Sequence, residues 1–173
     1  MLELRDIPRE IPETEAIVPA EWHCPDIDWP AVESFLTLVN VAGEALTAVD
    51  HYLSGHGMSR GRFMVMGVLA RETPKAMCPS DLAAVCGVTR ATITGLIDSL
   101  ERDNMVMRQQ SAGDHRMMHI RLTDEGRRFL DKVMPDYYRR VGQITVQLSQ
   151  SEKAGMHAAL GKIKAGIGAM TAQ

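Results

Sequence analysis

Four polar residues close together in the chain have the chemistry of a nucleic-acid contact: Thr89, Arg90, Thr92 and Thr94. Hydroxyl and guanidinium groups hydrogen-bond to base edges in a groove and to phosphate oxygens along it. Two of the four also have a plain structural reading, Thr89 as a helix N-cap and Thr92 as a residue on the helix flank. We predict contacts to bases and phosphates from this group.

A second polar pair, Asp114 and Arg116, lies in a short loop after Gly113, between the predicted strands Met105–Gln109 and Met117–Leu122. An Arg at the tip of a two-stranded hairpin can enter the narrow, negative minor groove of DNA. Asp114 could hold that Arg, or a neighbouring one, in place. The alternative is that both are solvated charges at a hairpin tip.

The first polar group requires a helix that turns it outward. From Thr89 to Glu101, the apolar residues Ile93, Leu96, Ile97 and Leu100 recur at spacings of three and four, which predicts one buried stripe. The opposite face carries only small and polar residues. A helix with such a thin outer face, followed by an Arg-tipped hairpin, suits a DNA groove and is typical of a winged helix-turn-helix.

Four short segments, in this order and spacing, resemble the MarR family of bacterial transcription regulators. They are Cys78–Ala83, Gly87–Thr92, Asp114–Arg116 and Leu122–Gly126. The resemblance extends over roughly Pro30 to Met170. It implies a mainly α fold with a small β-hairpin wing, in which N- and C-terminal dimerisation helices flank the winged helix-turn-helix.

The resemblance also implies a function: an obligate homodimer that binds double-stranded DNA at a pseudo-palindromic operator. The recognition helix would lie in the major groove and the wing in the minor groove, and a small aromatic or carboxylate ligand would release a repressor of this kind. One residue departs from the family pattern, because Gly95 stands where an Arg is frequent. The operator sequence of a relative therefore does not transfer to this chain.

The distribution of charge favours DNA even though the whole chain of 173 residues has a net charge of −3. The range 59–128 holds 11 Lys or Arg against 8 Asp or Glu, a balance of +3, whereas the range 1–58 holds 2 against 11, a balance of −9. Basic charge is thus concentrated where the reading elements are predicted. Arg60, Arg62, Arg102, Arg108 and Arg121 are secondary candidates for phosphate contacts, with solvated charge as the alternative.

Apolar seams near both ends of the chain predict dimerisation helices. Alternating spacings of three and four run through two predicted helices, about Trp29–Ser54 and the one that starts after Ser149. Their seam residues are Val32, Phe35, Val39, Ala42, Leu46, Val49 and Leu53, and then Met156, Leu160, Ile163, Ile167 and Met170. We also expect Pro135 to kink or break the long helix that starts at Thr123.

These patterns divide the chain into four parts. Residues 1–28 are an acidic, Pro-containing extension that we expect to be partly disordered. The range 29–57 is the N-terminal dimerisation helix, 58–126 the DNA-binding lobe, and 127–173 the C-terminal dimerisation helices. In the family, a ligand pocket lies between the dimerisation helices and that lobe. The residues expected to line it are His51, Arg62, Met66 and Tyr137, although ordinary packing would look the same.

Enzymatic chemistry is not expected, because the chain has no His-Glu-x-x-His, P-loop or Gly-x-Ser-x-Gly motif and so no predicted cofactor. The cluster His23–Asp26 lacks a partner at metal-site spacing. An odd number of cysteines, Cys24, Cys78 and Cys86, indicates a reducing cytoplasm, and we expect these thiols to be unreactive.

The longest apolar run, Phe63–Ala70, falls short of the roughly 20 residues of a membrane helix, so no membrane partner is expected. Two alternatives to a DNA-binding repressor released by a small ligand remain. One is a winged-helix module that binds protein, and the other is a thiol-based, redox-sensing regulator.

Overall fold

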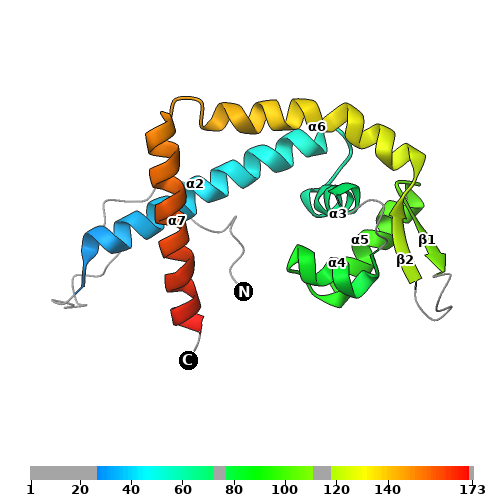
Figure 1. The fold of residues 1–173 in the computed structure, drawn as a ribbon, viewed down its shortest axis with the longest axis horizontal. Helices are drawn as coiled ribbons and strands as arrows, with labels where there is room; N and C mark the ends of the chain where they lie inside the picture. The colour runs from blue at the N-terminus through cyan, green and yellow to red at the C-terminus, as the bar shows by residue number, and fades with distance from the viewer. Residues whose placement is uncertain (1–26, 72–76, 111–117, 172–173) are drawn as a thin grey trace. The chain divides into compact units, whose positions relative to one another are not determined.

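The structure is a computed structural model that describes residues 27–71, 77–110 and 118–171. Its contacts divide the chain into two units, one up to Val65 and one from Met66 onward, and each is described by itself. Figure 1 shows the elements in chain order. They are α2 (Trp29–Ser54), α3 (Arg60–Arg71), α4 (Pro79–Cys86), α5 (Arg90–Arg102), β1 (Val106–Gln110), β2 (Met118–Leu122), α6 (Asp124–Ile144) and α7 (Gln150–Thr171).

The first unit is dominated by α2, whose observed bounds confirm the prediction of a helix over Trp29–Ser54. Asp28 caps it, because its carboxylate accepts a hydrogen bond from the amide of Ala31 at 3.2 Å. The chain turns after Gly55, and Ser59 begins α3 by accepting a bond from the amide of Arg62 at 3.4 Å. These caps are local, and this explains why periodicity and cap residues were enough to place both helices.

Within the described chain, the apolar seam of α2 is mostly half-buried and not fully covered. Leu53 is its one buried residue, and Phe35 keeps 49% of its surface exposed. By length and composition alone, α2 could also span a membrane. The sequence-based expectation considered only the longest uninterrupted apolar run, Phe63–Ala70, and so did not include this helix. Glu33 and Glu44 lie on the same helix as the seam. An apolar stripe on a helix that also carries charge suits packing against another helix.

The second unit contains the predicted reading elements around one small core. α4 packs against α5, α5 packs against β1, and β2 contacts both α4 and α6. The amide of Ile120 in β2 also donates to the carbonyl of Met77 at 2.8 Å, which adds a short third segment to the hairpin. The fully buried side chains of this core are Met66, Leu82, Ile93, Ile97, Leu100, Val106, Ile120 and Val133.

The hairpin and the two helices before it confirm the predicted winged helix-turn-helix. β1 and β2 pair antiparallel, with Val106 opposite Leu122 and Gln110 opposite Met118. β1 begins and ends one residue later than predicted, and β2 ends at the predicted Leu122. The predicted start of β2, Met117, lies outside the described residues. Gly87 closes α4 with φ of 65°, a left-handed conformation that glycine adopts without steric cost.

The long helix α6 runs from Asp124 to Ile144 without the break that Pro135 was expected to cause. A proline inside a helix removes one amide donor and leaves a carbonyl one turn earlier without its partner. That carbonyl belongs to Asp131, and both Asp131 and Pro135 are exposed, so water can satisfy it. Of the two effects expected from Pro135, a break is therefore absent, and a kink stays a prediction.

The last helix, α7, begins with the predicted capping box. The amide of Ser149 donates to the Glu152 carboxylate at 2.7 Å, and the Ser149 hydroxyl accepts from the Glu152 amide at 3.3 Å. Hydrogen bonds from the side chain and the backbone of Ser149 lower the pKa of Glu152. Past this cap, α7 is exposed almost throughout within a single chain, and Ile167 keeps 50% of its surface exposed.

Candidate nucleic-acid interface

The outer face of α5 presents the predicted polar group to solvent. Thr89 is the N-cap, and its Oγ1 accepts a hydrogen bond from the amide of Thr92 at 3.1 Å. Arg90, Thr92 and Thr94 are all exposed, while the apolar stripe of the same helix is buried. The cap and the amphipathic pattern are thus as predicted. The prediction that Thr89 caps the helix is confirmed, and Thr89 is nevertheless exposed on the surface.

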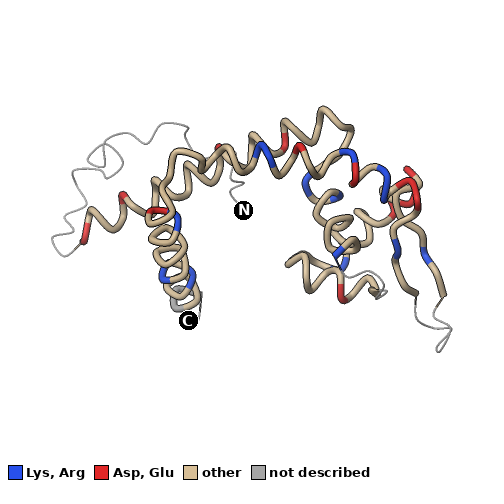
Figure 2. Tube along the Cα trace, turned by 45° about the horizontal axis from the view of Figure 1, so that its top comes forward, with Lys and Arg blue, Asp and Glu red and all other residues tan. Residues whose placement is uncertain are grey.

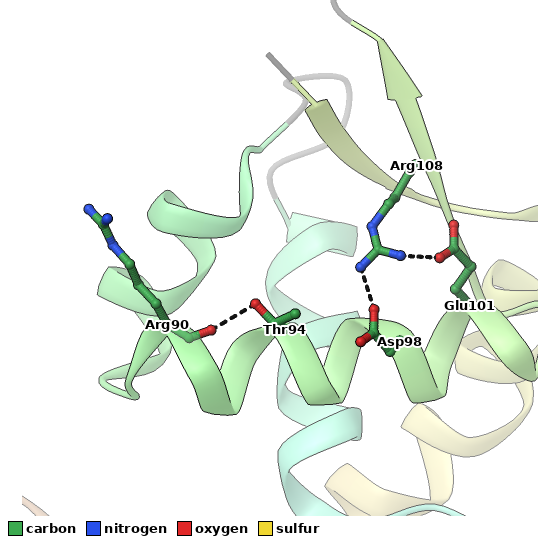
Figure 3. A network of polar contacts seen from close by, with 5 residues as sticks. All are labelled: Arg90, Thr94, Asp98, Glu101 and Arg108. Carbon is green, nitrogen blue, oxygen red and sulfur yellow. Dashed lines mark hydrogen bonds and ion pairs between the residues drawn. The ribbon is translucent and has the colours of Figure 1, made fainter. Parts of the chain in front are cut away.

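The hydroxyl groups on this face already have partners within the helix. Thr94 Oγ1 donates to the carbonyl of Arg90 at 2.8 Å, as Figure 3 shows, and the Oγ1 atoms of Thr89 and Thr92 lie 2.9 Å apart. A hydroxyl that donates its hydrogen to the backbone can still accept a hydrogen bond. In this rotamer, Thr94 can therefore accept from an amino group of a base, but it cannot donate to a phosphate.

Gly95 makes the centre of this face thin. It is exposed, and a Cβ atom added there would meet nothing within 4 Å. The missing side chain is thus not required by packing within the lobe. A glycine inside an exposed helix costs about 1 kcal/mol relative to alanine, so Gly95 lowers the stability of α5 without a packing reason within the lobe.

Arg108, expected among the secondary phosphate contacts, instead joins the hairpin to the recognition helix. From β1, its guanidinium donates to Asp98 Oδ1 at 2.5 Å and to Glu101 Oε2, and both carboxylates belong to α5. The hydrogen bond to Asp98 is the first cause of the raised pKa of Arg108. Figure 2 shows one basic segment on each strand and acidic segments gathered at one end of the hairpin. Sequence reasoning missed this cluster, because its partners come together only through tertiary packing.

The start of α6 is joined closely to the end of the recognition helix. Thr123 Oγ1 accepts from the amide of Gly126 at 3.0 Å and donates to the carbonyl of Asn104 at 2.6 Å. The amide of Thr123 also donates to the carbonyl of Met105 at 3.1 Å. In the turn after α5, Asn104 has φ of 56°, which lies in the left-handed region. The motif Leu122–Gly126 therefore acts as a joint that places the hairpin.

Gly126 in this joint is required by close packing. It is buried, and a Cβ atom there would overlap the Met105 carbonyl oxygen and lie 3.1 Å from its carbonyl carbon. The sequence signal that points to this contact is a glycine in the first turn of a capped helix, where no turn requires one. From the sequence, Gly126 was predicted only as part of the family pattern.

The predicted contacts of the wing include Asp114, Arg116 and Arg121. Asp114 and Arg116 lie outside the described residues. On the wing strands, Arg121 is exposed and forms no ion pair with the part of the chain that the structure describes. The minor-groove assignment of the wing tip thus stays a prediction.

The four residues expected to line a ligand pocket are divided between the two units. His51 is exposed, and Arg62 is half-buried with its Nη1 lying 3.5 Å from the Gly57 carbonyl oxygen. In the second unit, Met66 is fully buried and Tyr137 is half-buried beside Tyr138, with ring centroids 5.6 Å apart. A pocket shared by these residues stays a prediction.

Of the three cysteines, the structure describes two, both half-buried and both unbridged. Burial raises the pKa of the Cys86 thiol, so the thiol stays protonated at neutral pH. Cys78 occupies the N-cap of α4 without capping it, and its Sγ lies 2.9 Å from Ser80 Oγ.

Because the thiolate is the reactive form, Cys86 should react slowly with iodoacetamide at pH 7 in the folded protein. Mass spectrometry of timed samples would measure the rate, with urea-unfolded protein as the reference. Labelling of Cys86 as fast as in the unfolded chain would contradict this expectation and favour a redox-sensing role.

Comparison with known proteins adds evidence independent of this geometry. Residues 56–117, from the end of the α2–α3 turn to the wing, match the MarR family. The chain is also 33% identical over 152 residues to the HTH-type transcriptional repressor YetL of Bacillus subtilis, covering 88% of this chain and 89% of that one. The chain belongs to the MarR family. The predicted family and fold class are therefore confirmed.

Other MarR proteins support the same assignment. The transcriptional repressor MprA of Escherichia coli is 29% identical over 73% of each chain. CouR from Rhodococcus jostii, solved bound to p-coumaroyl-CoA, is 29% identical, with a TM-score of 0.63 over 74% of this chain and 89% of that one. The Staphylococcus aureus MepR–DNA complex, at 21% identity, shares the fold, with a TM-score of 0.69 over 76% and 94%. Members of this family are transcription regulators, which places the chain in that class.

Proposed function

We propose that this MarR protein is a cytoplasmic homodimeric repressor that binds a pseudo-palindromic operator and leaves it when a small ligand binds. The observation that carries the proposal is the outer face of α5, where Arg90 and Thr94 are exposed on a helix whose other face is buried. A helix of this kind enters the major groove with its N-terminal residues toward the bases. Similarity to the repressors YetL and MprA supports the direction of control.

The DNA contacts that we propose are the residues predicted from the sequence. Thr89, Arg90, Thr92 and Thr94 would contact bases and phosphates of the major groove. Arg116 would enter the minor groove from the wing tip, with Asp114 beside it. A positive side chain fits the negative potential of a narrow minor groove, and a hairpin gives it the necessary reach.

The dimer would form through the helices that flank the lobe, in the ranges 29–57 and 127–173. Exposed apolar residues of α7, Met156, Leu160 and Ile167, support this proposal, as does Phe35 of α2. An apolar surface of this extent on a soluble chain marks an interaction site. We propose that the lobe over 58–126 reads DNA and that the range 1–28 forms a separate extension.

Ligand control is proposed through a pocket to which His51, Arg62, Met66 and Tyr137 contribute. A cationic or imidazole side chain beside apolar residues suits an aromatic carboxylate. The p-coumaroyl-CoA bound to CouR supports an aromatic ligand for this chain as well. Such a ligand lowers operator affinity only if it binds the DNA-free form more tightly than the DNA-bound form.

Two substitutions separate the proposed roles of the helix and the wing. Arg90→Ala should change which bases are preferred as well as the affinity, because Arg90 begins the recognition helix. Arg116→Ala should weaken binding to all sequences and make the slope of log affinity against log salt shallower by up to about two units per dimer. The unfolding free energy of Arg90→Ala should stay within about ±0.5 kcal/mol of wild type, since the side chain is exposed.

Fluorescence anisotropy on one operator and its single-base variants, at several salt concentrations, would measure both effects. An Arg116→Ala protein with unchanged affinity and salt slope would contradict the wing assignment. Unchanged base preference in Arg90→Ala would contradict the role of the helix. A wild-type protein that shifts no genomic fragment at low salt would instead favour a protein-binding winged helix.

A further inference from the structure

The cluster formed by Asp98, Arg108 and Glu101 lies on the surface that the proposed function turns toward DNA. Asp98 and Glu101 continue the line of Arg90 and Thr94 along α5, at spacings of three and four, as Figure 3 shows. The side chain of Arg108 is 30% exposed, and those of Asp98 and Glu101 are 50% and 38% exposed. The polar line thus begins with a cation and ends with two carboxylates.

Two carboxylates at the C-terminal end of α5 lower both the stability of the helix and its attraction for DNA. Negative side chains near the C-terminal end of a helix oppose the helix dipole, and Asp98 and Glu101 stand in the last turns of α5. Carboxylates also repel the phosphates that a recognition helix approaches. With one Arg between two acids, the cluster has a formal charge of −1. A wing that only had to bind DNA would gain from an unpaired Arg108.

The Arg108 guanidinium donates one hydrogen bond to Asp98 and another to Glu101, so two separate contacts fix its position. Bonds from two nitrogen atoms to two carboxylates restrict an Arg side chain more than a single exposed ion pair does. Because Arg108 belongs to β1 and both acids belong to α5, these bonds also relate the wing strand to the recognition helix. Arg108 is thereby engaged by two carboxylates of the protein itself.

We propose that Asp98 and Glu101 hold Arg108 as a positioning residue that raises operator specificity: the cluster relates the wing to the helix and withholds one cation from unselective phosphate binding. This inference rests on the proposed function. DNA of any sequence presents the same phosphates, so a withheld cation lowers affinity for random DNA. Only an operator that fits both the recognition helix and the wing, at the spacing that the cluster fixes, recovers the lost affinity through base contacts.

The test compares wild type with Asp98→Asn/Glu101→Gln, which frees Arg108, and with Arg108→Gln, which leaves the two acids unpaired. Full-length proteins are titrated against the operator selected by the wild type and against a shuffled duplex, at four salt concentrations. Arg121→Gln is the matched control, because it removes an exposed Arg of the other wing strand that is not in the cluster. Thermal unfolding of each variant checks that it is folded.

The Asp98→Asn/Glu101→Gln protein, in which Arg108 is unpaired, should bind the shuffled duplex more tightly than wild type. Its slope of log affinity against log salt should be steeper by about one unit per protomer. Operator affinity should not rise in step, so the ratio of operator to shuffled affinity should fall severalfold. Arg108→Gln should weaken binding to both duplexes and also lower that ratio. Arg121→Gln should weaken both about equally and leave the ratio unchanged.

An acid-free variant with the wild-type ratio and salt slope would overturn the inference, as would an Arg108→Gln protein that behaves like Arg121→Gln. If the double variant does not fold, Asp98→Asn alone supplies the same comparison, since half of that side chain is exposed. A wild-type protein that selects no DNA overturns the proposed function itself. Selection by the wild type together with unchanged ratios in the variants overturns only the role of the cluster.

Discussion

Replacing Gly126 with Ala should destabilise the DNA-binding lobe by about 3 kcal/mol or more, enough to unfold a marginally stable domain. The added methyl group would overlap the carbonyl oxygen of Met105 and approach a Leu122 side-chain carbon at 3.2 Å. The neighbour that must move is backbone, and the same backbone carbonyl accepts the amide of Thr123. Relief of the overlap would therefore open the joint that begins α6.

Chemical denaturation followed by circular dichroism would measure this loss of stability. Gly95→Ala is the matched control, because it makes the same change in an exposed helix where nothing lies within 4 Å of the new methyl group. The control should gain about 0.5–1 kcal/mol from helix propensity. If Gly126→Ala were as stable as wild type, the close contact with Met105 would not exist in solution.

Placing a charge in the α2 seam should have the second large effect. Leu46→Glu would bury a carboxylate between helices in the proposed dimer, which costs several kcal/mol unless the dimer separates. We expect the protein to dissociate or unfold. It should then lose operator binding, because the DNA-binding lobe of a single protomer cannot contact two half-sites. Ile163→Glu in α7 should act in the same way.

Sedimentation equilibrium would give the assembly state of each variant. Thr37→Glu is a suitable control, since it puts the same charge on α2 at an exposed position opposite the seam. That variant should remain a dimer with wild-type stability within about 0.5 kcal/mol. A Leu46→Glu protein that is a folded, operator-binding monomer would refute the proposed interface.

The features that were predictable from the sequence depend on neighbours in the chain. Thr89, Thr123 and Ser149 each begin a helix with a hydrogen bond to an amide three residues later, so residue type and spacing were enough. The burial of Ile93 and Ile97 follows in the same way from helical periodicity. Such contacts do not depend on how the elements pack together.

The features that were missed depend on tertiary contact or on solvent. Arg108 looks like any basic wing residue until α5 and β1 pack together and place it between Asp98 and Glu101. The need for Gly126 appears only when the start of α6 meets the Met105 carbonyl. The absence of a break at Pro135 was not predictable, because the effect of a proline on a helix depends on whether the unpaired carbonyl is exposed to water.

Footprinting of DNA selected from genomic fragments by the purified wild-type protein tests the central claim most directly. If two recognition helices related by a two-fold axis read the operator, protection should cover two inverted half-sites about one helical turn, or roughly 10 bp, apart. Arg90→Ala should alter the base preference in both half-sites together. Protection of a single asymmetric half-site, or selection of no sequence at all, would contradict a dimeric operator-binding repressor.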